Sequence, residues 1–192
     1  TFVRRDKWLP KAKDLPVDEA EAMLLRRYLQ GYGPAGLVDF AAWAGMTVRD
    51  ATPIRERVGA ETVEVKIDSK IGLVLREDLE VLRNATISDN ERDSVRLLPS
   101  FDCYMLGHKE KNHIVDQAYY KQIYRKAGWL SPVVLVNGRA EGVWDCEKKG
   151  KHLHVKIEPF IKISKNVKKR VEEEAANLAH FYNTTYELVF TK

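Results

Sequence analysis

The first part of the chain repeats its hydrophobic positions with the period of an α-helix. Acidic side chains open the segment 17–29, and Arg26 and Arg27 close it, as the dipole of a helix favours. A shorter apolar run covers residues 35–44 and stops at Gly45. The inward stripe of the first segment comprises Ala22, Leu25 and Leu29. The pattern therefore predicts two consecutive helices.

A third helix is predicted to begin just after Thr47, because a threonine hydroxyl can accept a hydrogen bond from the first turn of a helix. Arg49 and Arg55 fall on the outward face of this helix. Its inward stripe comprises Val48, Ala51, Ile54 and Val58. Pro53 lies inside the pattern, so we expect either a kink or a start delayed to Thr52.

After the third helix the hydrophobic period changes to two over residues 63–76, which predicts a β-hairpin. Three short helices followed by a hairpin is the order of a winged helix, in which the third helix enters the major groove and the hairpin forms the wing. In this interpretation Arg49 and Arg55 would face the bases. Lys66 and Lys70 would contact DNA from the wing.

The second half of the chain mixes strand and helix patterns. Asn137-Gly138 favours a tight hairpin turn, and residues 148–151 form a second, very basic turn. Ser164 is expected to cap the last helix. The predicted elements are a short helix over 78–83, a loop and helix within 111–126, strands over 132–136, 140–146 and 152–157, a helix over 165–182 and an edge strand over 186–190.

Together these elements predict an α+β fold, in which a winged helix is followed by a β-rich C-terminal domain with a terminal helix. We expect a linker or docking segment over residues 1–16, because no apolar periodicity appears there. The winged-helix domain is expected over residues 17–94. An α+β domain with an antiparallel sheet is expected over residues 95–192.

The net charge of +4 is unevenly distributed along the chain. Residues 14–100 carry a net charge of −5, because 16 acidic residues outnumber 11 basic ones. Residues 145–170 carry a net charge of +6, with nine basic residues against three acidic ones. Such an asymmetry indicates one side that faces a polyanion, although a lysine-rich surface can also serve solubility alone.

Several kinds of chemistry find no support in the sequence. The chain has no apolar run that could span a membrane and no secretory signal, so we expect a cytoplasmic protein. Cys103 and Cys146 make neither a disulfide framework nor a zinc site. His152 and His154 are spaced for a shared ligand, but nearby lysines would repel a cation, so no metal site is predicted. No cofactor is expected, because no glycine-rich phosphate loop is present.

A series of short motifs within residues 96–160 occurs in an order typical of one family. The motifs are Arg96-Leu97-Leu98-Pro99-Ser100-Phe101-Asp102, Leu106-Gly107-His108-Lys109, Ser131-Pro132-Val133-Val134-Leu135-Val136-Asn137-Gly138-Arg139, Gly142-Val143-Trp144 and Glu158-Pro159-Phe160. On these motifs the chain resembles the winged-helix DNA-binding family that contains the AlkZ- and YcaQ-type DNA glycosylases. The resemblance extends from about residue 17 to residue 182.

The resemblance implies tandem winged helices, a concave DNA-binding surface and excision of alkylated bases, including those in interstrand crosslinks. In that family, hydrolysis is attributed to a Gln-x-Gln or Gln-x-Asp motif in the N-terminal winged helix. The glutamines of this chain are Gln30, Gln117 and Gln122, and none has Gln or Asp two residues later. We therefore expect either the C-terminal portion of a longer glycosylase or a member that only binds. No catalytic residue is assigned.

The leading expectation is binding of double-stranded DNA, with a missing N-terminal winged-helix domain of the same protein as a second partner. The candidate contacts in the second half are Arg125, Lys126, Lys148, Lys149, Lys151 and His152. One alternative is a transcription regulator in which Arg49 and Arg55 read a preferred sequence. Another is a protein-interaction module that uses the acidic winged helix and does not bind DNA at physiological salt.

Overall fold

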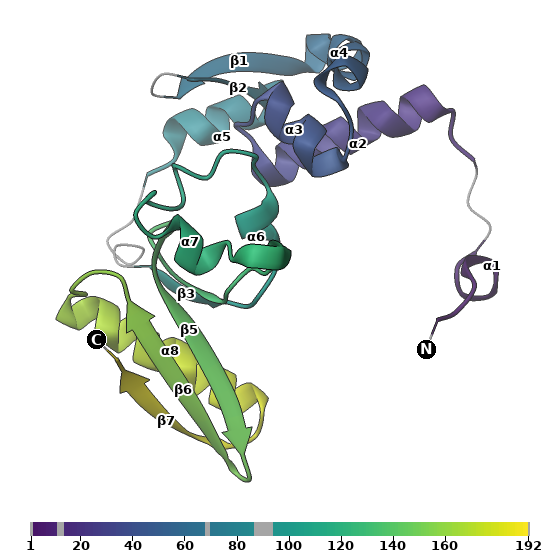
Figure 1. The fold of residues 1–192 in the computed structure, drawn as a ribbon. Helices are drawn as coiled ribbons and strands as arrows, with labels where there is room; N and C mark the ends of the chain where they lie inside the picture. The colour runs from purple at the N-terminus through teal and green to yellow at the C-terminus, as the bar shows by residue number, and fades with distance from the viewer. Residues whose placement is uncertain (1, 11–13, 68–69, 87–93, 192) are drawn as a thin grey trace. The chain divides into compact units, whose positions relative to one another are not determined.

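The computed structural model describes residues 2–10, 14–67, 70–86 and 94–191. Within it the chain divides into two compact units, Thr1–Arg83 and Asn84–Lys192, and each is described by itself. The fold is mixed α+β, as the sequence predicts, with a two-stranded sheet in the first unit and a five-stranded sheet in the second (Figure 1).

After a short N-terminal helix, the first unit holds three helices followed by a hairpin, in the order expected from the hydrophobic pattern. Its elements are α1 (Arg5–Trp8), α2 (Val17–Tyr32), α3 (Leu37–Ala44), α4 (Val48–Arg57), β1 (Thr62–Ile67), β2 (Lys70–Leu75) and the start of α5 (Leu79–Asn84). The four-residue helix α1 lies inside the segment expected to be a linker. Asp68 and Ser69, within the predicted hairpin, lie outside the described residues.

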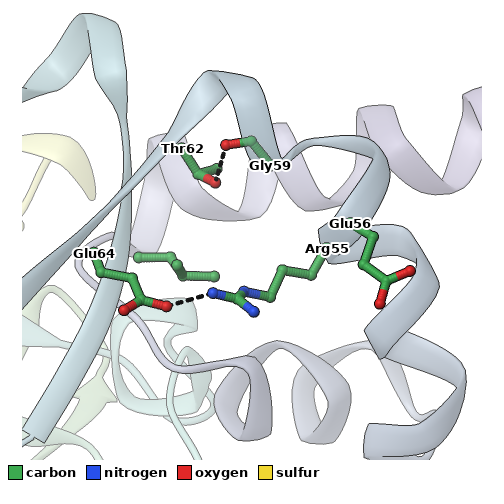
Figure 2. A pocket seen from close by; sticks show the side chains of 6 residues that line it. Arg55, Glu56, Gly59, Thr62 and Glu64 are labelled. Atoms are coloured by element: carbon green, nitrogen blue, oxygen red, sulfur yellow. Dashed lines mark hydrogen bonds and ion pairs between the residues drawn. The ribbon is translucent and has the colours of Figure 1, made fainter.

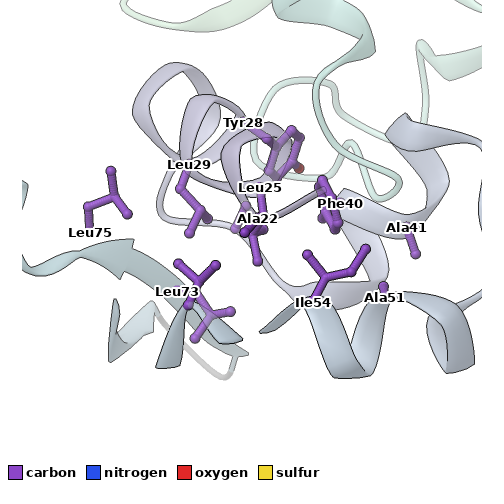
Figure 3. Packing of buried hydrophobic residues seen from close by; sticks show 12 residues of the cluster. Ala22, Leu25, Tyr28, Leu29, Phe40, Ala41, Ala51, Ile54, Leu73 and Leu75 are labelled. Carbon is purple, nitrogen blue, oxygen red and sulfur yellow. The ribbon is translucent and has the colours of Figure 1, made fainter. Parts of the chain in front are cut away.

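One hydrophobic core joins the three helices to the hairpin (Figure 3). Leu25 and Phe40 have no exposed surface, and Ile54 from α4 packs into the same cluster. Leu73 of β2 also joins it, and its backbone exchanges two hydrogen bonds with Ala35 in the connection between α2 and α3. Most of the stripes predicted from helical spacing thus lie in the core that holds the hairpin against the helices. Val48 was predicted to face inward, and this is wrong: its side chain is 43% exposed on the first turn of α4.

Helix α4 begins at Val48, so its start is not delayed to Thr52 by Pro53. The reason is a reciprocal cap: the Thr47 hydroxyl accepts a hydrogen bond from the backbone N–H of Asp50 at 3.2 Å, and the Asp50 carboxylate accepts one from the Thr47 N–H. Two backbone donors that the helix itself cannot satisfy are therefore satisfied by side chains. The helix continues through Pro53 to Arg57.

The second unit is built on a five-stranded sheet of order β3-β4-β5-β6-β7. Its elements are β3 (Val95–Leu98), α6 (Cys103–Leu106), α7 (Tyr120–Ile123), β4 (Val133–Val136), β5 (Arg139–Lys149), β6 (His152–Pro159), α8 (Lys165–Phe181) and β7 (Thr185–Phe190). The sequence predicts a loop and helix within 111–126, and the structure has only four helical residues there. The predicted loop over 87–94 lies, except for Ser94, outside the described residues.

The sheet is mixed, which corrects the expected antiparallel sheet. The first three strand pairs are antiparallel, but β6 and β7 run parallel. The cause is α8, whose 17 residues carry the chain back along the sheet, so that β7 starts at the same end as β6. The strand predicted over 186–190 does form the edge of the sheet, next to β6.

Two separate clusters of buried side chains support the sheet. One face packs against α8 through Val155 and Ile157 of β6 and Val171 of α8 (Figure 1). A second cluster, around Met105 and Ile123, holds α6 and α7 against the beginning of β4 and β5. As a result, the distal part of the β5–β6 hairpin, beyond the residues that pair with β4, carries its polar side chains on an open face.

Candidate nucleic-acid interface

The densest group of predicted contacts lies at the turn between β5 and β6. Lys149 pairs with His152, so the chain reverses through only Gly150 and Lys151. Gly150 has a φ of +60°, a conformation that a glycine adopts without strain. We call residues 148–151 the basic turn. The structure brings three of the predicted lysines and the predicted histidine together there.

The three lysines of the basic turn are exposed but differ in their contacts. The Lys148 ammonium lies 5.8 Å from the centre of the Tyr182 ring, on the side covered by α8. Lys149 binds the Glu147 carboxylate at 2.9 Å, and this hydrogen bond raises the pKa of the Lys149 ammonium. Lys151 is held by its backbone, whose carbonyl accepts a hydrogen bond from the Thr185 hydroxyl at 3.3 Å. The turn is therefore fixed by backbone contacts, and its ammonium groups are exposed, with that of Lys149 paired to Glu147.

Two histidines extend the polar face of β6 behind the basic turn. Nδ1 of His152 lies 2.6 Å from the Thr185 hydroxyl, and Nδ1 of His154 lies 2.9 Å from the Glu187 carboxylate. Among the residues that the structure describes, no group of three or more His, Cys, Asp or Glu side chains is placed to hold a metal ion. The partners of both histidines come from β7, and the sequence alone did not indicate them.

Arg125 and Lys126 are exposed but do not join the basic turn. They occupy the loop after α7, where the Arg125 N–H donates to the Trp129 carbonyl at 2.8 Å. This loop leads into β4, whose first residue pairs with Val143. Lys149 lies six positions after Val143 in β5, a length of about 20 Å along an extended strand. The two groups of cations therefore belong to different parts of the second unit.

In the first unit, Arg55 does not present a free guanidinium. It forms an ion pair with Glu64 of β1 inside a pocket of about 290 Å³ between α4 and the hairpin (Figure 2). Two further arginines are paired in the same way, Arg26 with Glu61 at 2.6 Å and Arg57 with Glu21 at 3.1 Å. The acidic residues of this unit thus neutralise cations that a DNA-binding helix would otherwise offer.

The other predicted contacts of the first unit lie on its surface. Arg49 is exposed on the first turn of α4 and makes no ion pair with any residue that the structure describes. Lys66 and Lys70 are exposed near the end of the hairpin, where Lys66 pairs with Ile71 and Lys70 with Ile67. Of the two arginines expected to face the bases, only Arg49 is therefore available without breaking a contact.

Some contacts around the basic turn lie beyond what sequence reasoning found. Tyr182, at the end of α8, supplies the ring under Lys148, and Glu187 of β7 pairs with His154. The alternation in residues 186–190 signals a strand, but it does not say which neighbour the strand pairs with. Only the parallel pairing of β7 with β6 shows that Glu187 faces His154.

Within the residues described, no helix is long and apolar enough to cross a lipid bilayer.

Comparisons with known proteins agree with the resemblance found in the motifs. The model of the AlkZ-like DNA glycosylase family matches residues 1–181. The interstrand DNA cross-link repair glycosylase of Streptomyces sahachiroi is 32% identical over 166 residues, which are 84% of this chain and 43% of that protein. The solved structure of Streptomyces sahachiroi DNA glycosylase AlkZ is similar with a TM-score of 0.79 and 29% identity, over 94% of this chain and 48% of that one. The chain therefore spans less than half the length of these relatives.

Proposed function

Because this chain belongs to the AlkZ-like DNA glycosylase family, we propose that it is a part of such a glycosylase that binds double-stranded DNA. The substrate of the whole protein would be DNA with alkylated or crosslinked bases, in line with the cross-link repair named for the Streptomyces sahachiroi relative. An N-terminal winged-helix domain that carries the Gln-x-Gln or Gln-x-Asp motif would complete the enzyme. Both cysteines are free thiols, which suits the reducing cytoplasm.

The observation that carries the proposal is the basic turn at the end of the β5–β6 hairpin. Residues 1–83 carry as many acidic as basic side chains, so the net charge of +4 comes from residues 84–192. Lys148, Lys149 and Lys151 concentrate part of this charge in the basic turn, at an end of the β5–β6 hairpin that extends past the residues paired with β4. A narrow projection with three ammonium groups suits contact with phosphates along a groove of duplex DNA.

The first unit would act as a winged helix that positions the duplex, with α4 as its recognition helix. Arg49, Lys66 and Lys70 are its candidate contacts, and Arg55 would join them only by leaving Glu64. A transcription regulator needs several free side chains at the bases, because base contacts supply sequence preference. The pairing of Arg55 therefore favours binding by charge and shape over reading of a sequence.

The test is fluorescence-anisotropy binding of the chain to an undamaged duplex at two salt concentrations. Substitution of Lys148, Lys149 and Lys151 by Glu should weaken binding and lower the slope of log affinity against log salt by up to about 3, since each lost phosphate contact removes about one released counterion.

A matched variant distinguishes loss of contacts at the basic turn from a general effect of net charge. Lys162, Lys165 and Lys169 lie exposed around the start of α8, at the opposite end of the sheet, and their replacement by Glu changes the charge by the same amount. This control should reduce the slope less than the basic-turn variant does. An equal reduction, or an unchanged slope in the basic-turn variant, would remove the turn from the interface. A strong preference for one undamaged sequence would favour the transcription regulator. Absence of binding would favour the protein-interaction module.

A further inference from the structure

An exposed aromatic pair lies in the second unit, away from the basic turn. Phe101 and Trp129 are 47% and 53% exposed, and their ring centres lie 5.3 Å apart at an angle of 84°. The edge-to-face contact leaves ring surface open to solvent. Exposed single hydrophobic residues are common, but two large rings that contact each other across 28 residues of sequence form a defined surface.

Both rings are carried by turns with an unfavourable backbone. Phe101 has a φ of +59°, a conformation that is an outlier for a bulky residue. The turn is held by Asp102, whose N–H donates to the Pro99 carbonyl and whose carboxylate accepts from the Tyr104 N–H at 2.9 Å. Asp102 is therefore the N-cap of α6, and the turn leaves the Phe101 side chain 47% exposed. Backbone strain of this kind concentrates at binding sites.

The loop that carries Trp129 shows the same feature. Ala127 has a φ of +58° and Gly128 a φ of +74°. The loop is closed by the hydrogen bond from the Arg125 N–H to the Trp129 carbonyl at 2.8 Å. This closure places two exposed cations, Arg125 and Lys126, within four residues of the ring.

Aromatic faces next to basic side chains are the elements from which proteins build stacking sites for nucleic-acid bases. Asp102 is the one acidic residue inside either turn. Its carboxylate accepts a hydrogen bond from the Tyr104 N–H. By contrast, Tyr120 and Tyr124 of the same region stack on each other at 4.6 Å, and the Tyr124 hydroxyl donates to the Met105 carbonyl. The Tyr120 and Tyr124 rings therefore take part in packing within the unit, whereas Phe101 and Trp129 are exposed to solvent.

We propose that the Phe101–Trp129 pair is a stacking site for a DNA base that has left the duplex stack, with Arg125 and Lys126 on the adjacent phosphates. This inference rests on the proposed function, because it assumes that the chain binds DNA. The second unit would then have two kinds of contact with DNA. The basic turn contributes affinity for any duplex, and the aromatic pair contributes preference for a duplex with an unpaired base.

The experiment compares two fluorescent duplexes of the same sequence, one fully paired and one with a single additional unpaired adenine, by anisotropy with the full chain. The unmodified chain should bind the second duplex more tightly. Trp129→Ala should weaken binding to that duplex by about tenfold and leave binding to the paired duplex unchanged. Phe101→Ala should act in the same direction, while Trp129→Phe should retain most of the preference.

Two controls make the result specific. Trp8→Ala removes an aromatic side chain that is 77% exposed in the first unit and should leave both affinities unchanged. The variant in which Lys148, Lys149 and Lys151 are replaced by Glu should lower the affinity for both duplexes by the same factor. The midpoint of thermal unfolding of Trp129→Ala shows whether that variant is folded.

The stacking site is overturned if the unmodified chain binds both duplexes equally, or if Trp129→Ala and Phe101→Ala keep its preference. In either case salt-dependent binding to the paired duplex would leave the proposed function standing. Absence of binding to both duplexes at low salt would overturn the proposed function and the stacking site together.

Discussion

At the scale of single residues, ion pairs decide which cations of the first unit can contact DNA. Arg55 was predicted to face the bases, but its guanidinium binds Glu64. The Arg55 side chain is 41% exposed and the Glu64 side chain 54%. Exposed pairs of this kind contribute little to stability, so a phosphate can compete with the carboxylate. In the proposed interface, Arg55 would therefore contact DNA only after leaving Glu64.

Replacement of Glu64 by Gln tests this dependence. The change removes one negative charge and releases Arg55, so the affinity for duplex DNA at low salt should rise by about three- to tenfold. Glu56→Gln removes the same charge from an exposed position of α4 where no ion pair with a described residue exists, and it should raise the affinity less. Titrations of both variants by anisotropy measure the difference. Equal effects of the two changes would show that Arg55 takes no part in binding.

At the scale of elements, α8 determines the architecture of the second unit. It carries the chain from the end of β6 back to the start of β7, and its buried face packs on the sheet through Val171 and Ala175. Its first turn is capped by Ser164, whose hydroxyl accepts a hydrogen bond from the Val167 N–H at 3.1 Å. The cap fixes where the helix begins and thus how it lies along the sheet.

Ser164→Ala should reduce the free energy of unfolding by about 1 kcal/mol, because the first turn of α8 loses its side-chain acceptor. Ser164→Asp should keep the stability of the unmodified chain, since aspartate is an equally good cap. Urea denaturation followed by circular dichroism gives both values. A loss of the same size in both variants would mean that the hydroxyl acts by another contact.

At the scale of the whole molecule, charge is divided between the two units. The first unit is neutral and pairs its arginines with glutamates that come from other elements, as in Arg26–Glu61. The hydrogen bond from Arg26 lowers the pKa of Glu61. The second unit carries the excess positive charge and uses few pairs at the basic turn. Acid should weaken the Arg26–Glu61 pair of the first unit, because protonation removes the charge of Glu61.

A pH comparison of the unmodified chain with Glu61→Gln tests this. The folded pKa of Glu61 is lowered, so the pair stabilises the fold above the ordinary pKa of a glutamate and this stability is lost as the pH falls through the folded pKa. The unmodified chain should unfold at a higher temperature than Glu61→Gln at about pH 7, and the difference should shrink as the pH falls below the ordinary pKa of a glutamate. Glu77→Gln, at a position with no ion pair to a described residue, should show no such change. A difference that persists in acid would contradict the assignment to the ion pair.

Local patterns in the sequence determined helices α2, α3 and α4, the hairpin that follows them, the basic turn and the cap of α8, because helical period, alternation and turn residues act over a few positions. The family likewise followed from motifs that can be read in order along the chain. Contacts between distant segments were decided only by the tertiary structure: the parallel pairing of β7 with β6, the ion pair of Arg55 with Glu64, and the contact of Phe101 with Trp129. The physical reason is that a side chain's own sequence neighbours do not specify which remote residue will face it. That partner depends on how the elements pack, and the packing determines which cations and rings remain exposed.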